Sequence, residues 1–178
     1  MGMNRLLSVE LVPKSTWYNN VRSRVSRDKW NAIRVHFKKP SCAYCGCGYG
    51  LHCHEVWKYD DVNHIQRLVG FESVCFLCHA VKHLGLAGIQ AQQGYLDYSG
   101  LVEHYCVVNE CTEENFLADR KEAFRLWEER SKYEWTIDTS YLDTLDLPKY
   151  VNNREKVRVW MKEHPDEVVR IKEKGGIA

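Results

Sequence analysis

The stretch that decides the fold is residues 41–84, SCAYCGCGYGLHCHEVWKYDDVNHIQRLVGFESVCFLCHAVKHL. Two Cys-x-x-Cys pairs lie within it, Cys42 with Cys45 and Cys75 with Cys78. Zinc in a structural role prefers a closed tetrahedral shell of sulfur ligands, and four thiolates supply that shell. We therefore expect a four-Cys zinc site that pins both ends of the intervening segment, with Cys47 as the substitute ligand.

Two histidines after the second cysteine pair have the spacing of metal ligands on a helix. His79 follows Cys78 directly, and His83 lies four residues further on in a stretch that reads as helical. Side chains at positions i and i+4 share one helix face, so the two imidazoles point to one spot. A zinc-clamped hairpin followed by this helix would bring His54 to the same place.

The extended segment after the first cysteine pair carries four groups that can bind metal or titrate. Because side chains alternate along a strand, His52 and His54 share one side, and Cys53 and Glu55 share the other. Histidines interleaved with zinc ligands in this way favour a metal site over a set of unrelated core residues.

In the motifs CAYCG, LHCHEVW and VCFLCHAVKH the chain resembles the HNH endonucleases, the zinc-braced branch of the His-Me finger (ββα-metal) nucleases. The resemblance covers about residues 41–84, and the flank SVELVPKSTWYNNVRSRV is similar to that of small bacterial and phage HNH proteins. It implies a ββα-metal core and hydrolysis of phosphodiester bonds that leaves 5′-phosphate and 3′-hydroxyl ends. It also implies a catalytic divalent cation, Mg²⁺ or another such as Mn²⁺, Ni²⁺ or Zn²⁺.

The resemblance further implies roles for individual histidines. The histidine of the first strand is the general base, which makes His54 the base here, or His52 if the register shifts. A residue just after the second cysteine pair holds the catalytic cation, which makes His79 a ligand and His83 its second ligand.

The chain departs from the family pattern at three places, the first of which is a distance from Cys45 to His54 that is shorter than expected. The family often has an Asp or His ligand immediately before the base, where this chain has Cys53. Either Cys53 binds a metal softer than magnesium, or Glu55 or His52 takes that task. The central Asn of the family name has no clean match, and Asn63 and His64 are the candidates.

Charge is distributed unevenly along the chain, although the net charge is only +1. Residues 1–40 carry nine basic and two acidic side chains, whereas residues 85–141 carry five basic and eleven acidic ones. The field that steers a polyanion is local, so the small net charge does not argue against a polyanion partner. Together with the resemblance, the basic segment leads us to expect a nucleic-acid partner, DNA rather than RNA. The acidic helices after residue 95 offer a surface on which two copies could pair as a homodimer. The candidate phosphate contacts are Arg22, Arg24, Arg27, Arg34 and Lys82.

The remaining pattern is mostly helical. It predicts a helix over residues 15–25 behind the cap Ser15, and a second one from near Ser26 that stops before Pro40. A helix after the second cysteine pair should end at Gly85. Further helices are expected over residues 96–108, after the cap Thr112, and around residues 154–172.

The expected fold class is therefore α+β, mainly helical, with a zinc-braced ββα-metal core flanked by helices. We expect a basic helical segment over residues 1–40, the core over 41–88, a helical cover over 89–141 and an appendage over 142–178. No apolar run approaches the ~20 residues that cross a bilayer, and the first residues lack a signal cleavage site, so a cytoplasmic protein without a membrane partner is expected.

Two other classes of function fit part of this pattern. A zinc-binding interaction module for nucleic acid or protein needs only the four cysteines and the basic helices, and it has no hydrolytic activity. A redox protein would use a Cys-x-x-Cys pair as a dithiol, with one thiol of low pKa and no tightly held zinc. The histidines distinguish the nuclease from both, because neither alternative needs them to converge.

Overall fold

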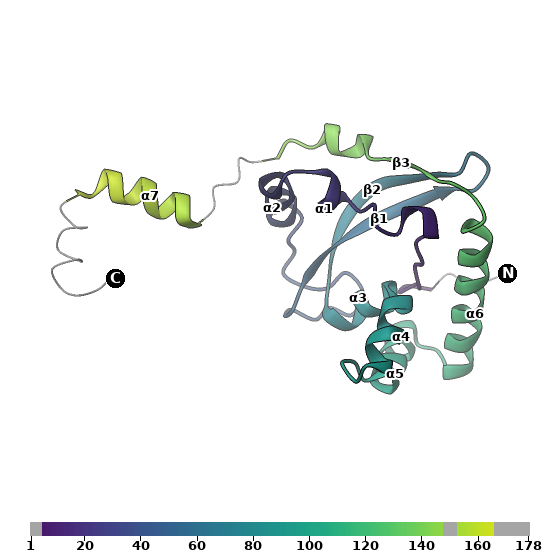
Figure 1. Ribbon diagram of the computed structural model, residues 1–178. Helices are drawn as coiled ribbons and strands as arrows, with labels where there is room; N and C mark the ends of the chain where they lie inside the picture. Colours follow the sequence, from purple (N-terminus) through teal and green to yellow (C-terminus); the bar gives the residue numbers. More distant parts are fainter. Residues whose placement is uncertain (1–4, 148–152, 166–178) are drawn as a thin grey trace.

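An antiparallel β-hairpin is the centre of the structure, a computed structural model that describes residues 5–147 and 153–165 (Figure 1). Its strands are β1 (His52–Asp60) and β2 (Ile65–Val74), paired from His52↔Val74 to Asp60↔Ile65 with an irregularity between Val56 and Trp57. A short strand, β3 (Thr136–Asp138), pairs in parallel with β2, giving the sheet order β1-β2-β3. The sequence pattern did not predict β3.

Helices make up most of the rest, and the expected α+β, mainly helical fold is confirmed. None of the helices over residues 5–147 and 153–165 is long and apolar enough to cross a membrane. Their bounds are η1 (Lys14–Thr16), α1 (Val21–Arg24), α2 (Arg27–His36), α3 (Phe76–Lys82), α4 (Leu84–Gln92), α5 (Tyr98–Asn109), α6 (Glu113–Arg130), η2 (Ser140–Thr144) and α7 (Asn153–Glu163).

Two helix starts lie where the sequence predicted them. The Ser26 side chain accepts from the Lys29 N–H and caps α2, and Thr112 forms a capping box with Asn115 at the start of α6. Such a cap typically contributes about 1 kcal/mol, because it pairs a backbone N–H that the helix leaves unsatisfied. The expected helix over 96–108 is α5, capped by Asp97.

Other boundaries differ from the prediction. Residues 15–25 form no single helix: a 3₁₀ turn ends at Thr16, and the four-residue α1 is capped by Asn20 rather than by Ser15. Gly85 ends no helix either, because the break falls at His83 (φ −102°, ψ 45°) and α4 begins immediately after it. Of the helix expected over 154–172, α7 ends at Glu163, and residues 166–172 lie outside the described part of the chain.

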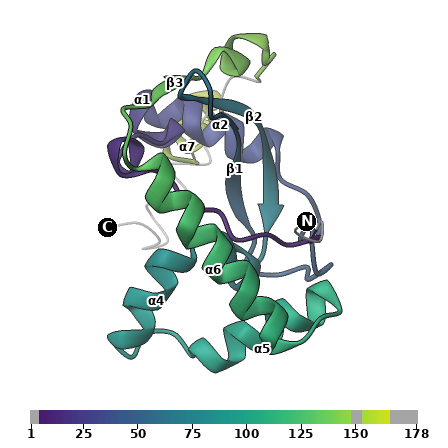
Figure 2. The same cartoon turned by 90° about the vertical axis from the view of Figure 1, so that its right-hand side faces the viewer.

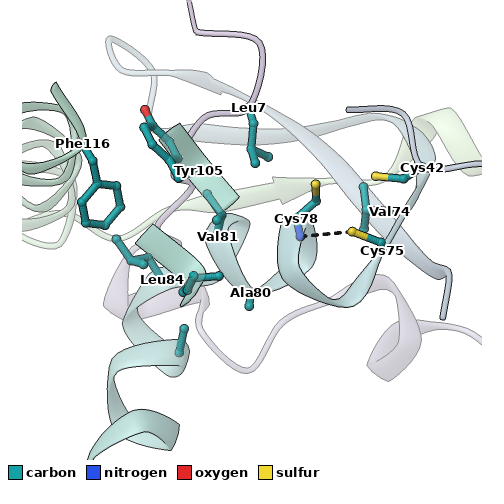
Figure 3. Packing of buried hydrophobic residues seen from close by; sticks show 12 residues of the cluster. Leu7, Cys42, Val74, Cys75, Cys78, Ala80, Val81, Leu84, Tyr105 and Phe116 are labelled. Carbon is teal, nitrogen blue, oxygen red and sulfur yellow. Dashed lines mark hydrogen bonds between the residues drawn. The ribbon is translucent and has the colours of Figure 1, made fainter. Parts of the chain in front are cut away.

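The two faces of the hairpin pack against different helices. One buried cluster joins the end of β2 to α3, α4, α5 and α6, and Figure 3 shows its members Leu7, Val81, Tyr105 and Phe116. The other cluster packs β2 on the N-terminal helices through Val21, Ile33, Leu68, Phe71 and Leu142. Burying a side chain of this size contributes about 1.5–3 kcal/mol, so both faces of the hairpin are held firmly.

Helix α6 is fastened to the rest of the fold near each end, and Figure 2 shows it running from α5 toward β3. The Asp119 carboxylate accepts from Arg5 Nε at 2.7 Å and from the Tyr105 hydroxyl at 2.9 Å. At the other end Arg130 makes two hydrogen bonds, of 2.7 and 3.0 Å, to Asp61 in the hairpin turn. A bidentate pair of this kind fixes orientation as well as distance, so α6 braces the tip of the hairpin.

Candidate metal centres

The sulfur atoms of Cys42, Cys45, Cys75 and Cys78 all lie within 4.8 Å of one another. Figure 3 shows three of these cysteines beside Val74 at the end of β2. Zinc–sulfur bonds of about 2.3 Å in a tetrahedron place neighbouring sulfurs about 3.8 Å apart. The Cys45 and Cys75 sulfurs are 3.5 Å apart, so the group fits a zinc ion.

Local backbone geometry explains why these four side chains converge. The first pair sits in a turn closed by hydrogen bonds from the Cys42 N–H to the Cys47 carbonyl and from the Gly46 N–H to the Cys42 carbonyl. Gly46 has φ +74°, a conformation that favours glycine. Cys75 is the N-cap of α3, and the Cys78 N–H points at the Cys75 sulfur from 3.5 Å. Cys47, the expected substitute ligand, lies outside the group of four.

The protonation of these thiols depends strongly on their surroundings. Burial opposes ionisation of Cys42, but hydrogen bonds from nearby backbone N–H groups lower its pKa to about 7. Burial raises the pKa of Cys75 to about 11 and raises the pKa of Cys78 further. A cation that binds thiolates would have to displace these protons, so its binding would depend on pH.

His104 of α5 adds a contact to this centre that the sequence pattern did not reveal. Its Nε2 lies 3.1 Å from the Cys78 sulfur. A ring N–H directed at a ligating thiolate stabilises its charge and fixes its direction. The contact also attaches α5 to the centre.

Three imidazoles form the second candidate centre. The ligand atoms of His54, His79 and His83 lie within 4.8 Å of one another. His54 lies in β1, His79 lies in α3, and His83 is the C-cap of α3. Ring centroids are 5.3 Å apart for His54 and His79, 5.1 Å for His54 and His83, and 4.6 Å for His79 and His83. The convergence expected from the sequence is therefore present.

Burial keeps two of these imidazoles in the form that binds a metal. Burial, followed by the neighbouring imidazoles, lowers the pKa of His79 to about 3. Burial and His54 lower the pKa of His83 to about 4. Both rings are consequently neutral near pH 7, and neutral imidazole is a common ligand for divalent metals.

Glu10 orients the third imidazole, and the sequence pattern did not point to it. Its Oε2 lies 3.3 Å from His54 Nε2, and its Oε1 lies 2.5 Å from the Lys82 ammonium. Burial disfavours ionised Glu10, but the His54 hydrogen bond and the charge of Lys82 hold its pKa below the usual value. Because an ionised carboxylate only accepts, the hydrogen bond to Glu10 requires a proton on Nε2 of His54.

Lys82 belongs to this interior network. It is only 4% exposed, and its ammonium lies between the carboxylates of Glu10 and Glu72, 3.7 Å from the latter. Glu72 in turn accepts from the Tyr44 hydroxyl at 2.6 Å, which leads to the turn that carries Cys42 and Cys45. Lys82 therefore does not lie at the surface, where we expected a phosphate contact, because two carboxylates hold its charge inside.

Cys53 and Glu55 are not part of the histidine group. Strand alternation places them on the opposite face of β1, where Cys53 packs against the cluster around Ile33. Glu55 accepts from the Val21 N–H at 2.9 Å and from Trp57 Nε1 at 3.2 Å, so its carboxylate holds the start of α1. Neither residue can share a cation with His79 in this arrangement, and the expectation of a fourth ligand there is corrected.

Asn63 and His64 lie in the hairpin turn, roughly 25 Å along β1 from its start at about 3.3 Å per residue. Asn63 donates to Asp60 at 2.8 Å, and the His64 ring stacks on Tyr133 at 4.1 Å. Both residues serve the turn and do not approach the three imidazoles.

The remaining predicted residues lie on the surface. Arg22, Arg24, Arg27 and Arg34 are exposed on α1 and α2, and the described part of the chain gives none of them an acidic partner. His52 is also exposed, and its ring stacks on His79 with centroids 5.0 Å apart and planes 9° from parallel. His52 therefore flanks the histidine group from the solvent side.

Comparison with known proteins does not assign this chain to a family. No family model, no curated protein and no solved structure matches this chain. What is shown is a β-hairpin followed by helices, with one four-Cys and one three-His group that could each bind a metal ion.

Proposed function

We propose that this protein is a metal-dependent endonuclease that hydrolyses phosphodiester bonds of nucleic acid, with DNA as the expected substrate. The observation that carries the proposal is the convergence of His54, His79 and His83 beside a cysteine group that ties the turn before β1 to the start of α3. A purely structural zinc module needs no such second group. The resemblance of the surrounding motifs to HNH endonucleases agrees with this assignment.

His54 is the general base in this proposal, and Glu10 is its orienting partner. Nδ1 of His54 takes the proton of a water molecule as the water oxygen forms its bond to phosphorus and the bond to the 3′ oxygen breaks. Imidazole is the side chain that most often serves as a general base in such a transfer. The Glu10 carboxylate stabilises the imidazolium that forms, as the third member of a nucleophile–base–orienter arrangement does.

His79 and His83 would hold the catalytic cation, since both rings are neutral and close together. When bound, a divalent cation supplies Lewis-acid stabilisation of the pentacovalent phosphate and of the leaving oxygen. The four cysteines would hold a structural zinc ion that fixes the position of α3 relative to the turn before β1. His52, exposed and without a carboxylate partner among the described residues, is the alternative base.

A plasmid-nicking assay tests the proposal. Purified protein is incubated with supercoiled plasmid and Mg²⁺, Mn²⁺ or Ni²⁺, with and without chelator, beside a His54→Ala, His79→Ala double variant. We expect nicked and linear DNA only with wild-type protein and added cation. A wild-type protein that holds zinc and binds DNA but cuts none would instead favour the zinc-binding interaction module.

A further inference from the structure

We propose that the hollow between α2 and the start of β1 binds a backbone phosphate of the nucleic acid, next to the phosphate that is cleaved. This inference rests on the proposed function. The hollow has a volume of about 300 Å³, and the residues that matter in its lining are Asn31, Arg34, Lys38, His52 and Ser73.

The helix holds two of these side chains, and the segment just after it adds a third. Asn31 and Arg34 follow the spacing i, i+3 and share one side of α2, and Lys38 lies directly after the helix C-cap Phe37 and lines the same hollow. Ile33, on the opposite side of the helix, is fully buried in the cluster around Phe71. Asn31 and Arg34 are therefore fixed by the packing behind the helix, and Lys38 follows the packed end of that helix.

The charge and chemistry of the lining suit a phosphate. Arg34 and Lys38 are exposed, and no ion pair within residues 5–147 and 153–165 involves either. None of the described residues that line the hollow carries a carboxylate. A guanidinium, an ammonium, an amide and an imidazole thus face one space, and these are the donors that proteins direct at phosphate oxygens.

His52 connects this hollow to the candidate catalytic centre. Its ring lines the hollow and also stacks on His79 at 5.0 Å. A strand whose phosphate rests on Arg34 and Lys38 would therefore continue across His52 to the three imidazoles. Contacts of this kind grip the backbone and position the scissile bond without reading the base sequence.

The test measures binding without cleavage. Full-length zinc-loaded protein, with no other divalent cation added, is titrated into a fluorescein-labelled duplex and into a single strand of the same sequence at several salt concentrations. Arg34→Gln and Lys38→Gln should each weaken binding on the order of fivefold, and each should lower the slope of log affinity against log salt by about 1. Unrelated sequences should give the same losses.

Lys39→Gln is the matched control. Lys39 is exposed and adjacent to Lys38, one residue further from the end of α2, but it does not line the hollow. Each variant therefore removes one positive charge just beyond the helix terminus. We expect Lys39→Gln to bind within about twofold of wild type. Equal losses for Lys38→Gln and Lys39→Gln, or none in the Arg34→Gln, Lys38→Gln double variant, would overturn the subsite.

The outcomes separate this inference from the nuclease proposal. If binding depends on Arg34 and Lys38 but the protein never cuts plasmid, the phosphate subsite is supported and the nuclease proposal is contradicted. If wild-type protein cuts plasmid and the double variant binds with unaltered affinity and salt slope, only the subsite is contradicted. A wild-type protein that binds neither oligonucleotide removes both.

Discussion

Glu10 and His54 are 44 residues apart in the sequence, and their Oε2 and Nε2 atoms lie 3.3 Å from each other. Glu10 reaches this position because its N–H donates to the Lys82 carbonyl at 3.0 Å, which holds the N-terminal segment against the end of α3. A segment outside the cysteine motifs thereby supplies a charged partner to the candidate catalytic imidazole.

Glu10→Gln should lower kcat for plasmid cleavage by about 10- to 100-fold and leave KM nearly unchanged, because a neutral amide stabilises the imidazolium less. Glu72→Gln is the control, since it also removes a carboxylate beside Lys82. Glu72 is the cross-strand neighbour of His54, but the His54 ring makes its hydrogen bond to Glu10. Steady-state rates and urea unfolding of both variants check the prediction. Equal rate losses in the two variants would mean that Glu10 acts only through the stability of the network.

His54→Ala should abolish cleavage, with a loss of at least about 10²-fold, while zinc content and fold persist. The reason is that, among residues 5–147 and 153–165, only His54 combines a carboxylate partner with proximity to both candidate ligands. His52→Ala, which removes the exposed neighbour, should cost much less. If His52→Ala is the inactive variant and His54→Ala still cuts, the roles of the two residues are reversed.

Cys75→Ser should remove the structural zinc and unfold the protein, because zinc bound by such sites contributes on the order of 10 kcal/mol or more to folding. Cys47→Ser, at a cysteine in the turn of Cys42 and Cys45 but outside the group of four, should keep the metal. Elemental analysis and thermal unfolding distinguish the two variants. A zinc-free preparation with normal thermal stability would contradict the structural role and revive the dithiol alternative.

Stepwise chelation should separate the two centres. A site of two or three exchangeable imidazole ligands should lose its cation at low chelator concentration, whereas a closed four-thiolate shell should resist. Cleavage should therefore disappear while circular dichroism stays unchanged, and it should return when Mg²⁺, Mn²⁺ or Ni²⁺ is added back. Simultaneous loss of activity and helical signal would show that one metal serves both purposes.

Lys82→Met should lower the free energy of unfolding by about 2–3 kcal/mol, because it leaves the partly buried Glu10 and Glu72 without their shared cation. The same change should leave oligonucleotide affinity unaltered. Lys132→Met, at an exposed pair with Glu129, is the control and should be stable. Urea unfolding and anisotropy measure the two effects, and weaker DNA binding by Lys82→Met would restore its role as a phosphate contact.

The cysteine and histidine spacing was enough to predict the hairpin, the following helix and the two side-chain groups. Fixed spacing within a strand or helix determines direction, so the sharing of one face by His52 and His54 could be read from the sequence. The roles of Glu10 and His104 could not be predicted from the sequence, because long-range packing brings each of these single residues to its centre. The burial of Lys82 could not be predicted for the same reason, because its two carboxylate partners come from the N-terminal segment and from β2.

The fully buried side chain of Leu7 and the carboxylate of Glu10 have a practical consequence for anyone who wishes to trim this protein. A fragment cut to residues 41–88 would keep every cysteine and histidine of the two groups and would look complete by its motifs. It would nevertheless leave a cavity in the hydrophobic core where Leu7 packs, and His54 would lose the carboxylate of Glu10. The smallest working piece must therefore start before Leu7.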